Sequence, residues 1–128
     1  MSHKIYVVED HPVMREAYAA VLGATPGFEL CGTAETAEEL LGKLADLDCD
    51  LMVTDFRLPG MSGAELVWRL QDLRPDLPCV VISAHEDEAF ARESLAAGAA
   101  AFLQKQDLVS TLVPTIHAVL DERRRAAA

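Results

Sequence analysis

The sequence is poor in basic residues, and it contains no long apolar run. Only 11 of the 128 residues are Lys or Arg, against 21 Asp or Glu, which gives a formal charge of −10. The phosphate backbone of a nucleic acid would repel so acidic a chain, so direct binding of nucleic acid through these residues is not expected. The composition is better suited to binding a divalent cation or a basic protein surface.

No segment approaches the roughly 18 consecutive apolar residues of a membrane span, and residues 1–4 lead directly into an apolar strand pattern. We therefore expect neither a signal peptide nor membrane association. The three cysteines, Cys31, Cys49 and Cys79, form no CxxC pair, and the four histidines have no metal-ligand spacing with Cys or with one another. Reduced cysteines in the core or loops of a cytoplasmic protein are expected.

The chain has the length of one domain, and five short apolar runs alternate along it with longer helical patterns. The runs lack polar alternation, which is typical of strands buried on both faces of a parallel sheet. They are Ile5–Val8, Phe28–Cys31, Leu51–Thr54, Cys79–Ser83 and Ala101–Leu103. Repeated βα units predict a single α/β domain with a (βα)5 flavodoxin-like, doubly wound parallel sheet and helices on both faces.

Start and stop signals mark the helices between these runs. Pro12 suits the first position of a helix, and Gly23 suits its end. We expect the buried face of this helix to comprise Val13, Ala17, Ala20 and Val21. Two S/T-x-x-E capping boxes predict further helix starts, at Thr36 with Glu39 and at Ser62 with Glu65. Tyr18 and Trp68 are expected to be packing residues.

The start of the last helix is ambiguous because of Pro114. If Asp107 caps the helix, Pro114 lies deep inside it and removes a backbone hydrogen bond. If Ser110 or Thr111 is the cap, Pro114 falls in the first turn, where it does less harm. We prefer the later start, or a bent helix.

Polar residues follow four of the five predicted strands. They are Glu9 and Asp10 after the first, Asp55 after the third, Ser83 after the fourth and Lys105 after the fifth. Ligands of open α/β sheets bind beyond the carboxyl ends of the strands. Each residue alone would more often be a cap, a turn residue or a solvated charge, but five in register are harder to explain in that way. Three neighbouring carboxylates repel one another, and a hard cation such as Mg²⁺ or Mn²⁺ would resolve the repulsion.

The sequence resembles the receiver domain of two-component response regulators, over residues 3 to about 122. The resemblance rests on the segments YVVEDHPVMREAYAAVL, LMVTDFRLPGMSGAEL, VVISAH and AAAFLQK. The EDHP opening and the D-x-R-x-P-G-M-S-G turn resemble the LuxR/NarL-type subgroup, whose members often carry a helix-turn-helix domain after the receiver. We therefore expect a receiver domain at 1–122. The tail at 123–128 is either the start of a linker to an output domain or of artificial origin.

The resemblance implies a role for each residue at the strand ends. Asp55 corresponds to the phosphoacceptor. Glu9 and Asp10 correspond to the acidic pair that binds Mg²⁺ together with Asp55 and the backbone carbonyl of Arg57. Ser83 and Lys105 correspond to the hydroxyl and the ammonium that contact the phosphoryl group.

The resemblance also implies a switch and its partners. Phe102 corresponds to the aromatic residue that moves together with Ser83, and the side chains of Arg57 and His85 correspond to positions that tune the lifetime of the phosphoryl group. The expected partner is a sensor histidine kinase, with a homodimer formed through the fourth helix, fifth strand and fifth helix. DNA would be bound only through an output domain outside these residues. The domain would phosphorylate and dephosphorylate only itself, and so would not be an enzyme acting on other substrates.

Some positions depart from the family pattern. Glu9 stands where Asp is common and Ser83 where Thr is more frequent, and both keep the needed oxygens. Gln106 replaces a usual Asp, and Pro114 is unusual in a helix that often forms the dimer surface. These last two put the usual phosphorylation-driven dimer in question, although not the fold.

Alternative functions make different demands on the sequence. A stand-alone receiver, or a protein-interaction domain that is not phosphorylated, is the main alternative. A phosphatase or dehalogenase with an Asp nucleophile would need a second carboxylate where Arg57 stands, and a nucleotide-binding protein would need a Gly-rich loop where Pro12 and Val13 stand.

Overall fold

The five apolar runs form one parallel sheet in the computed structural model, which describes residues 2–84 and 88–127. The spatial order of the strands is β2-β1-β3-β4-β5, and every pair of neighbours is parallel. The strands are β1 (His3–Val8), β2 (Phe28–Ala34), β3 (Leu51–Asp55), β4 (Cys79–Ser83) and β5 (Ala101–Gln104). The predicted α/β fold is therefore confirmed.

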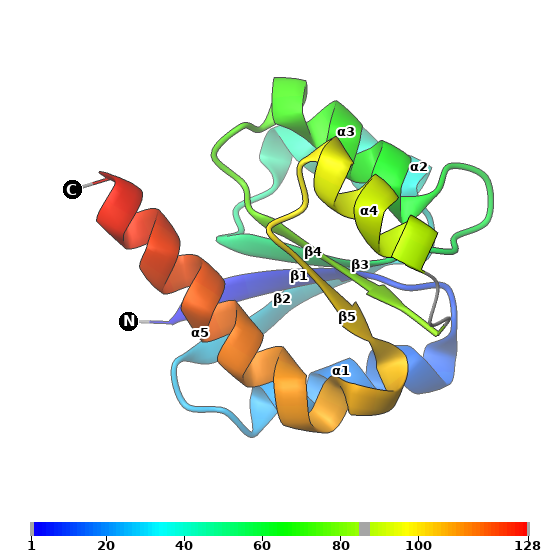
Figure 1. The fold of residues 1–128 in the computed structure, drawn as a ribbon. Coiled ribbons are helices and arrows are strands. Elements are labelled where there is room, and N and C mark those ends of the chain that lie inside the picture. The colour runs from blue at the N-terminus through cyan, green and yellow to red at the C-terminus, as the bar shows by residue number, and fades with distance from the viewer. Residues whose placement is uncertain (1, 85–87, 128) are drawn as a thin grey trace.

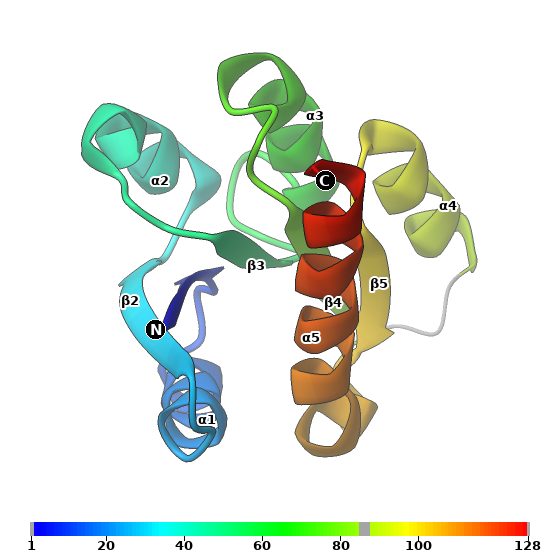
Figure 2. The same ribbon diagram turned by 90° about the vertical axis from the view of Figure 1, so that its left-hand side faces the viewer.

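Within the described residues, five helices cover the two faces of this sheet. They are α1 (Pro12–Gly23), α2 (Ala37–Lys43), α3 (Gly63–Leu73), α4 (Glu88–Ala97) and α5 (Leu108–Ala127), with short 3-10 turns at Leu44–Asp46 and Lys105–Asp107. Helices α1 and α5 lie on one face, and α2, α3 and α4 lie on the other (Figures 1 and 2). This is the doubly wound arrangement that the sequence predicts. No helix in the described part of the chain is long and apolar enough to cross a bilayer.

Apolar residues fill the space between the sheet and each helical layer. Every residue of β3 and β4 is buried, because successive side chains point to opposite faces and both faces are covered. On the α1/α5 side, Val7 and Val53 of the sheet pack in one cluster with Leu112 and Ile116 of α5. This burial on both faces explains why the strands lack the alternating polar residues of a half-exposed sheet.

Both predicted helix starts are confirmed, and each has the N-cap hydrogen bond of a capping box. The side chain of Thr36 accepts a hydrogen bond from the backbone N–H of Glu39 at 3.0 Å. The side chain of Ser62 accepts one from the backbone N–H of Glu65 at 3.1 Å. Each bond satisfies a backbone donor that the first turn of a helix would otherwise leave without a partner.

Strand β2 is longer than predicted. It continues through Gly32 and Thr33 to Ala34, whereas the predicted run ends at Cys31. The ring of Tyr6 lies where a side chain of residue 32 would be, with its Cε2 only 2.7 Å from an ideal Cβ position at Gly32. The hydroxyl of Tyr6 also donates a hydrogen bond to the carbonyl of Thr33 at 3.0 Å. These residues look like the end of a strand in the sequence, but pairing with β1 continues through them.

The predicted buried face of α1 is only partly right, because Val21 packs against the core and Ala17 is half-buried, but the other two residues face solvent. Val13 is 74% exposed and Ala20 is also exposed, whereas Tyr18 and Leu22 are fully buried. Two apolar stripes of helical spacing compete on this helix, and the one with the larger side chains buries more apolar area. Tyr18 is thus a packing residue as expected, but Trp68 of α3 is 61% exposed, contrary to the expectation.

The last helix begins earlier than the preferred prediction. Helix α5 starts at Leu108, so Pro114 lies in its interior. An interior proline costs a helix roughly 3 kcal/mol. The cost is offset because Leu108, Leu112 and Ile116 bury one side of the helix across the proline, and each fully buried side chain of this kind contributes about 1.5–3 kcal/mol.

Gly63 allows helix α3 to start directly against the end of β3. Its backbone N–H donates a hydrogen bond to the carbonyl of Phe56 at 2.8 Å. A Cβ atom at Gly63 would overlap the carbonyl oxygen of Asp55, which is backbone and cannot rotate away. The position of Asp55 therefore depends on a residue without a side chain at position 63.

We predict that Gly63→Ala destabilises the protein by about 1–3 kcal/mol, because the backbone of β3 or α3 must shift to relieve the overlap. The free energy of unfolding is to be measured by urea denaturation. Gly42→Ala is the matched control: Gly42 is an exposed helical glycine with open space around it, so the substitution should stabilise the protein by roughly 0.5–1 kcal/mol. Equal effects of the two substitutions would show that the close approach at Gly63 is unimportant.

Candidate functional site

The carboxyl ends of the strands bring the predicted polar residues to one edge of the sheet. Val8 of β1 pairs in register with Thr54 of β3, so Glu9 and Asp55 follow neighbouring positions on adjacent strands. Lys105 comes directly after β5. The start of β1 and the C-terminal end of α5 lie toward the opposite edge (Figure 1).

Lys105 lies between two buried carboxylates. Its Nζ atom is 3.0 Å from Oδ2 of Asp55 and 3.0 Å from Oε1 of Glu9. The side chain of Glu9 is fully buried, and that of Asp55 is 4% exposed. Removal of such carboxylates from water is costly unless an opposite charge lies beside them, and Lys105 supplies that charge.

The pKa values of these groups reflect burial and mutual repulsion. Burial and the neighbouring charge of Glu9 raise the pKa of Asp55 to about 6, although Lys105 acts in the opposite direction. Burial also acts to raise the pKa of Glu9, but Lys105 and His11 outweigh it and hold that pKa below its ordinary value. Asp55 is therefore the carboxyl group of the pair that takes up a proton first.

Asp10 and His11 extend the site on the side away from Lys105. Nδ1 of His11 lies 3.1 Å from Oε2 of Glu9 and 3.2 Å from Oδ1 of Asp10. The backbone N–H of His11 also donates to Oε2 of Glu9 at 3.2 Å. Sequence patterns contain no signal for His11, because its neighbours in the site are carboxylates and not the Cys or His residues of a familiar metal-ligand spacing.

This arrangement fits a bound divalent cation. One potential ligand atom from each of Glu9, Asp10, His11 and Asp55 lies within 4.8 Å of the others. Oδ1 of Asp10 is buried but accepts no hydrogen bond from any described residue. Carboxylate oxygens are the ligands that Mg²⁺ and Mn²⁺ prefer, and a cation would satisfy this atom and reduce the repulsion among the acids.

Ser83 lies at the end of β4, and Phe102 lies within β5. Ser83 is 1% exposed at the end of β4 and pairs in register with Gln104 of β5. Asp55 pairs with Ile82, the residue before Ser83. Phe102 is half-buried and packs against the core on the α2–α4 side of the sheet. His85 lies outside the described residues.

The loop after β3 contacts helix α4 through a stack of side chains. The ring of Phe56 stacks on that of Phe90, with a centroid distance of 4.2 Å and an interplanar angle of 17°. The guanidinium carbon of Arg57 lies 5.5 Å from the centroid of the same Phe90 ring. Sequence patterns do not predict this contact, although an aromatic residue directly follows Asp55. The contact connects the segment beside Asp55 to a helix on the surface.

Known proteins share this fold and sequence pattern. The family model for the response regulator receiver domain matches residues 5–117. The response regulator GacA of Pseudomonas syringae pv. syringae is 30% identical over 121 residues, covering 94% of this chain and 56% of that protein. The transcriptional regulatory protein FixJ of Rhizobium meliloti is 35% identical over 103 residues, covering 80% of this chain and 50% of that protein.

A solved structure agrees closely in three dimensions. The two-component response regulator of the LuxR family from Aurantimonas sp. SI85-9A1 superposes with a TM-score of 0.90 at 28% identity, covering 96% of this chain and 88% of the other. The chain thus spans about half the length of the curated relatives GacA and FixJ, with 56% and 50% covered.

We predict that Asp55→Asn stabilises the fold at neutral pH in the absence of divalent cations. The carboxyl group has a pKa of about 6 in the folded protein, against 3.8 ordinarily, so ionisation of Asp55 opposes folding above pH 6. A shift of this size corresponds to at most about 3 kcal/mol at pH 8. The difference between variant and wild type should decrease as the pH falls from about 6 towards 4, where Asp55 binds a proton in the folded state.

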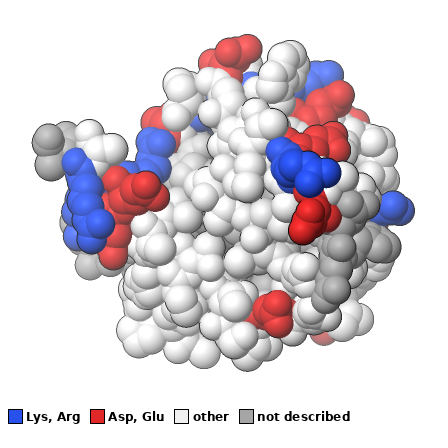
Figure 3. All heavy atoms as spheres, in the orientation of Figure 1, with Lys and Arg blue, Asp and Glu red and all other residues white. Residues whose placement is uncertain are grey.

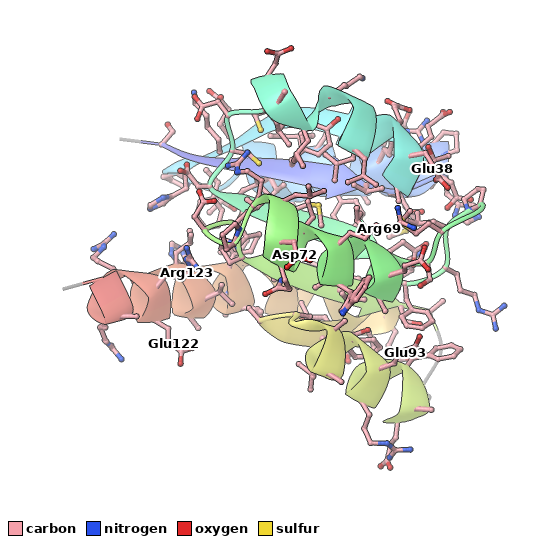
Figure 4. The ribbon with its side chains drawn as sticks, turned by 90° about the horizontal axis from the view of Figure 1, so that it is seen from above. Glu38, Arg69, Asp72, Glu93, Glu122 and Arg123 are labelled. Carbon is pink, nitrogen blue, oxygen red and sulfur yellow. The ribbon has the colours of Figure 1, made fainter. Side chains whose placement is uncertain are left out.

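The free energies of unfolding are to be measured by urea denaturation in EDTA between pH 4 and 8. Asp72→Asn is the matched control, because Asp72 is an exposed acid on α3 (Figure 4). Its effect should stay within about 0.5 kcal/mol at every pH. A lower stability of Asp55→Asn at pH 8 would contradict the prediction.

Proposed function

Because this chain belongs to the response regulator receiver domain family, we propose that it is a phosphorylation-dependent switch in which Asp55 accepts a phosphoryl group from a sensor histidine kinase. The observation that best supports the proposal is the buried carboxylate of Asp55, held 3.0 Å from the ammonium group of Lys105 at the carboxyl edge of the sheet. Glu9 and Asp10 lie beside it. The proposal accounts for why so many charged groups are gathered at an otherwise apolar sheet.

The proposed chemistry has two steps, the transfer of a phosphoryl group to Asp55 and the hydrolysis of the product. A carboxylate oxygen of Asp55 attacks the phosphorus of the kinase phosphohistidine, and the phosphorus–nitrogen bond breaks with its electron pair returning to the imidazole. The product is an acyl phosphate. Water then attacks the same phosphorus, releases inorganic phosphate and restores the carboxylate. The cycle modifies only this chain, as expected of a switch and not of an enzyme with an external substrate.

Each neighbouring residue has a defined task in this proposal. Lys105 neutralises charge on the phosphoryl oxygens, and the hydroxyl of Ser83 donates a hydrogen bond to one of them. Glu9, Asp10 and Asp55, with the backbone carbonyl of Arg57, would hold Mg²⁺ or Mn²⁺. The cation, when bound, supplies positive charge for the oxygens of the transferring group.

The response of the fold would pass from Asp55 to the surface of α4, β5 and α5. In the proposed switch Ser83 moves toward the phosphoryl group, and the half-buried ring of Phe102 rotates into the space released. A phosphoryl group adds about −1.5 to −2 charge beside Lys105, which is a large electrostatic change in a buried site. We propose that Arg57, through its contact with Phe90, and His85 tune the lifetime of this state.

The proposed output is control of transcription through a DNA-binding domain beyond the residues of this chain. FixJ is named as a transcriptional regulatory protein, and this chain covers only 50% of it. The proposed dimer contact is the face of α4, β5 and α5. Figure 3 shows that much of the surface on the side facing the viewer carries no charged group, and that its charged side chains form a few separate clusters.

We predict that acetyl phosphate with Mg²⁺ adds the mass of one phosphoryl group to the protein. The adduct should be absent with EDTA and in Asp55→Asn, because each removes an essential part of the site. Intact-mass spectrometry is the measurement, and Asp72→Asn should react like the wild type. No adduct under conditions that modify a known receiver would favour the alternative of a domain that acts without phosphorylation.

We also predict that phosphorylation raises the self-association of the chain. Sedimentation velocity before and after acetyl phosphate treatment measures this, and Asp55→Asn should not respond. An unchanged sedimentation coefficient in a fully phosphorylated sample would exclude the dimer as the output of this domain, while leaving the phosphotransfer intact.

A further inference from the structure

His11 adds a nitrogen donor to a site whose other ligand atoms are carboxylate oxygens. Its Nδ1 atom lies 3.1 Å from Oε2 of Glu9 and 3.2 Å from Oδ1 of Asp10. Two ligand atoms that bind one cation at about 2.1 Å and at a right angle lie roughly 3.0 Å apart. The separations in this structure are therefore close to those of atoms sharing a metal ion.

The two carboxylate oxygens of Glu9 face different neighbours. Oε1 lies 3.0 Å from Nζ of Lys105, and Oε2 lies toward His11. Glu9 is fully buried, and neither its Oε1 nor the buried Oδ1 of Asp10 has an aligned hydrogen bond among the described residues. Lys105 thus neutralises charge beside Asp55 and Oε1 of Glu9. A second positive group would be needed beside His11, near Oε2 of Glu9.

A proton on Nδ1 of His11 can be donated well to only one of the two carboxylate oxygens that lie beside it. One N–H donates a good hydrogen bond to one acceptor, and the oxygens of Glu9 and Asp10 lie at nearly the same distance from the nitrogen. A cation in place of that proton would contact both oxygens and the nitrogen together. The arrangement of the three groups therefore suits a metal better than it suits a hydrogen.

Backbone hydrogen bonds hold residue 11 beside the first turn of α1. His11 is the residue before the first turn of α1, and its side chain makes no cap hydrogen bond to that helix. Its carbonyl accepts from the backbone N–H of Arg15 at 3.0 Å, and Arg15 in turn donates to the carbonyl of Glu9 at 2.9 Å. The ring is 64% exposed, so a cation can reach it from water.

We propose that His11 is a metal ligand through Nδ1, and that the site consequently prefers first-row transition cations such as Mn²⁺, Co²⁺ and Ni²⁺ to Mg²⁺. The inference rests on the proposed function, because it concerns the same cation site. Imidazole is a good ligand for late transition metals, whereas Mg²⁺ prefers oxygen and keeps several waters. The nitrogen donor thus raises affinity for one class of cation with little gain for the other.

The first test looks for the bond itself. Mn²⁺ is added to the metal-free full chain without a histidine tag, and electron spin-echo modulation is recorded. Modulation from a directly bound ¹⁴N nucleus is expected in the wild type and should be lost in His11→Asn. The asparagine can keep a hydrogen bond to Glu9, so the comparison separates ligation from hydrogen bonding.

The second test measures selectivity by titration calorimetry with Ni²⁺ and Mg²⁺. His11→Asn should lower Ni²⁺ affinity by roughly tenfold or more, which is the size of effect that changes around metal ligands produce. The affinity for Mg²⁺ should change by less than about threefold, because its oxygen ligands remain. His117→Ala is the matched control, since His117 lies exposed on α5 against Phe28, and it should leave both affinities unchanged.

The outcomes distinguish this inference from the function on which it rests. Mg²⁺-dependent phosphorylation of Asp55 without ¹⁴N modulation, or with equal Ni²⁺ affinity in wild type and His11→Asn, would overturn the role of His11 alone. Absence of binding by every cation, together with absence of phosphorylation, would overturn both. Loss of binding in Asp10→Asn would confirm that the measured cation occupies this site.

Discussion

The contact of one ammonium group with two buried carboxylates holds the site of this protein together. Nζ of Lys105 lies 3.0 Å from both Glu9 and Asp55, which come from the ends of two neighbouring strands. Without that charge, burial and repulsion would favour protonation of the acids or their exposure to water. Even with it, the pKa of Asp55 is raised to about 6. The site therefore retains an excess of negative charge that a cation can reduce.

The fold makes this concentration of charge possible and connects it to the surface. A doubly wound sheet directs the carboxyl ends of β1, β3 and β5 to one edge, while apolar contacts on both faces stabilise the strands behind it. Gly63 lets α3 start against Asp55. The stack of Phe56 on Phe90 joins the next residue of the chain to α4. A change of charge at Asp55 is thus one or two packed residues away from a surface helix.

Most of the fold could be predicted from the sequence because its signals are local. Apolar runs without alternation predict buried parallel strands, and the Thr36 and Ser62 boxes predict helix starts that the structure confirms. Local patterns mislead where two of them compete. Helix α1 offers two apolar stripes, and only packing against the sheet selects the one with Tyr18 and Leu22. Pro114 argues against an early start of α5, but the burial of Leu112 and Ile116 outweighs that local preference.

Hydrophobic periodicity and position in the chain are enough to predict the succession of strands and helices and the residue types that follow each strand. They do not determine how those residues meet. Only the tertiary structure placed Lys105 between Glu9 and Asp55, turned Oε2 of Glu9 toward His11 and stacked Phe56 on Phe90. The reason is physical: distances of about 3 Å between side chains depend on strand register, loop path and rotamer together. None of these is encoded in the spacing of a single segment.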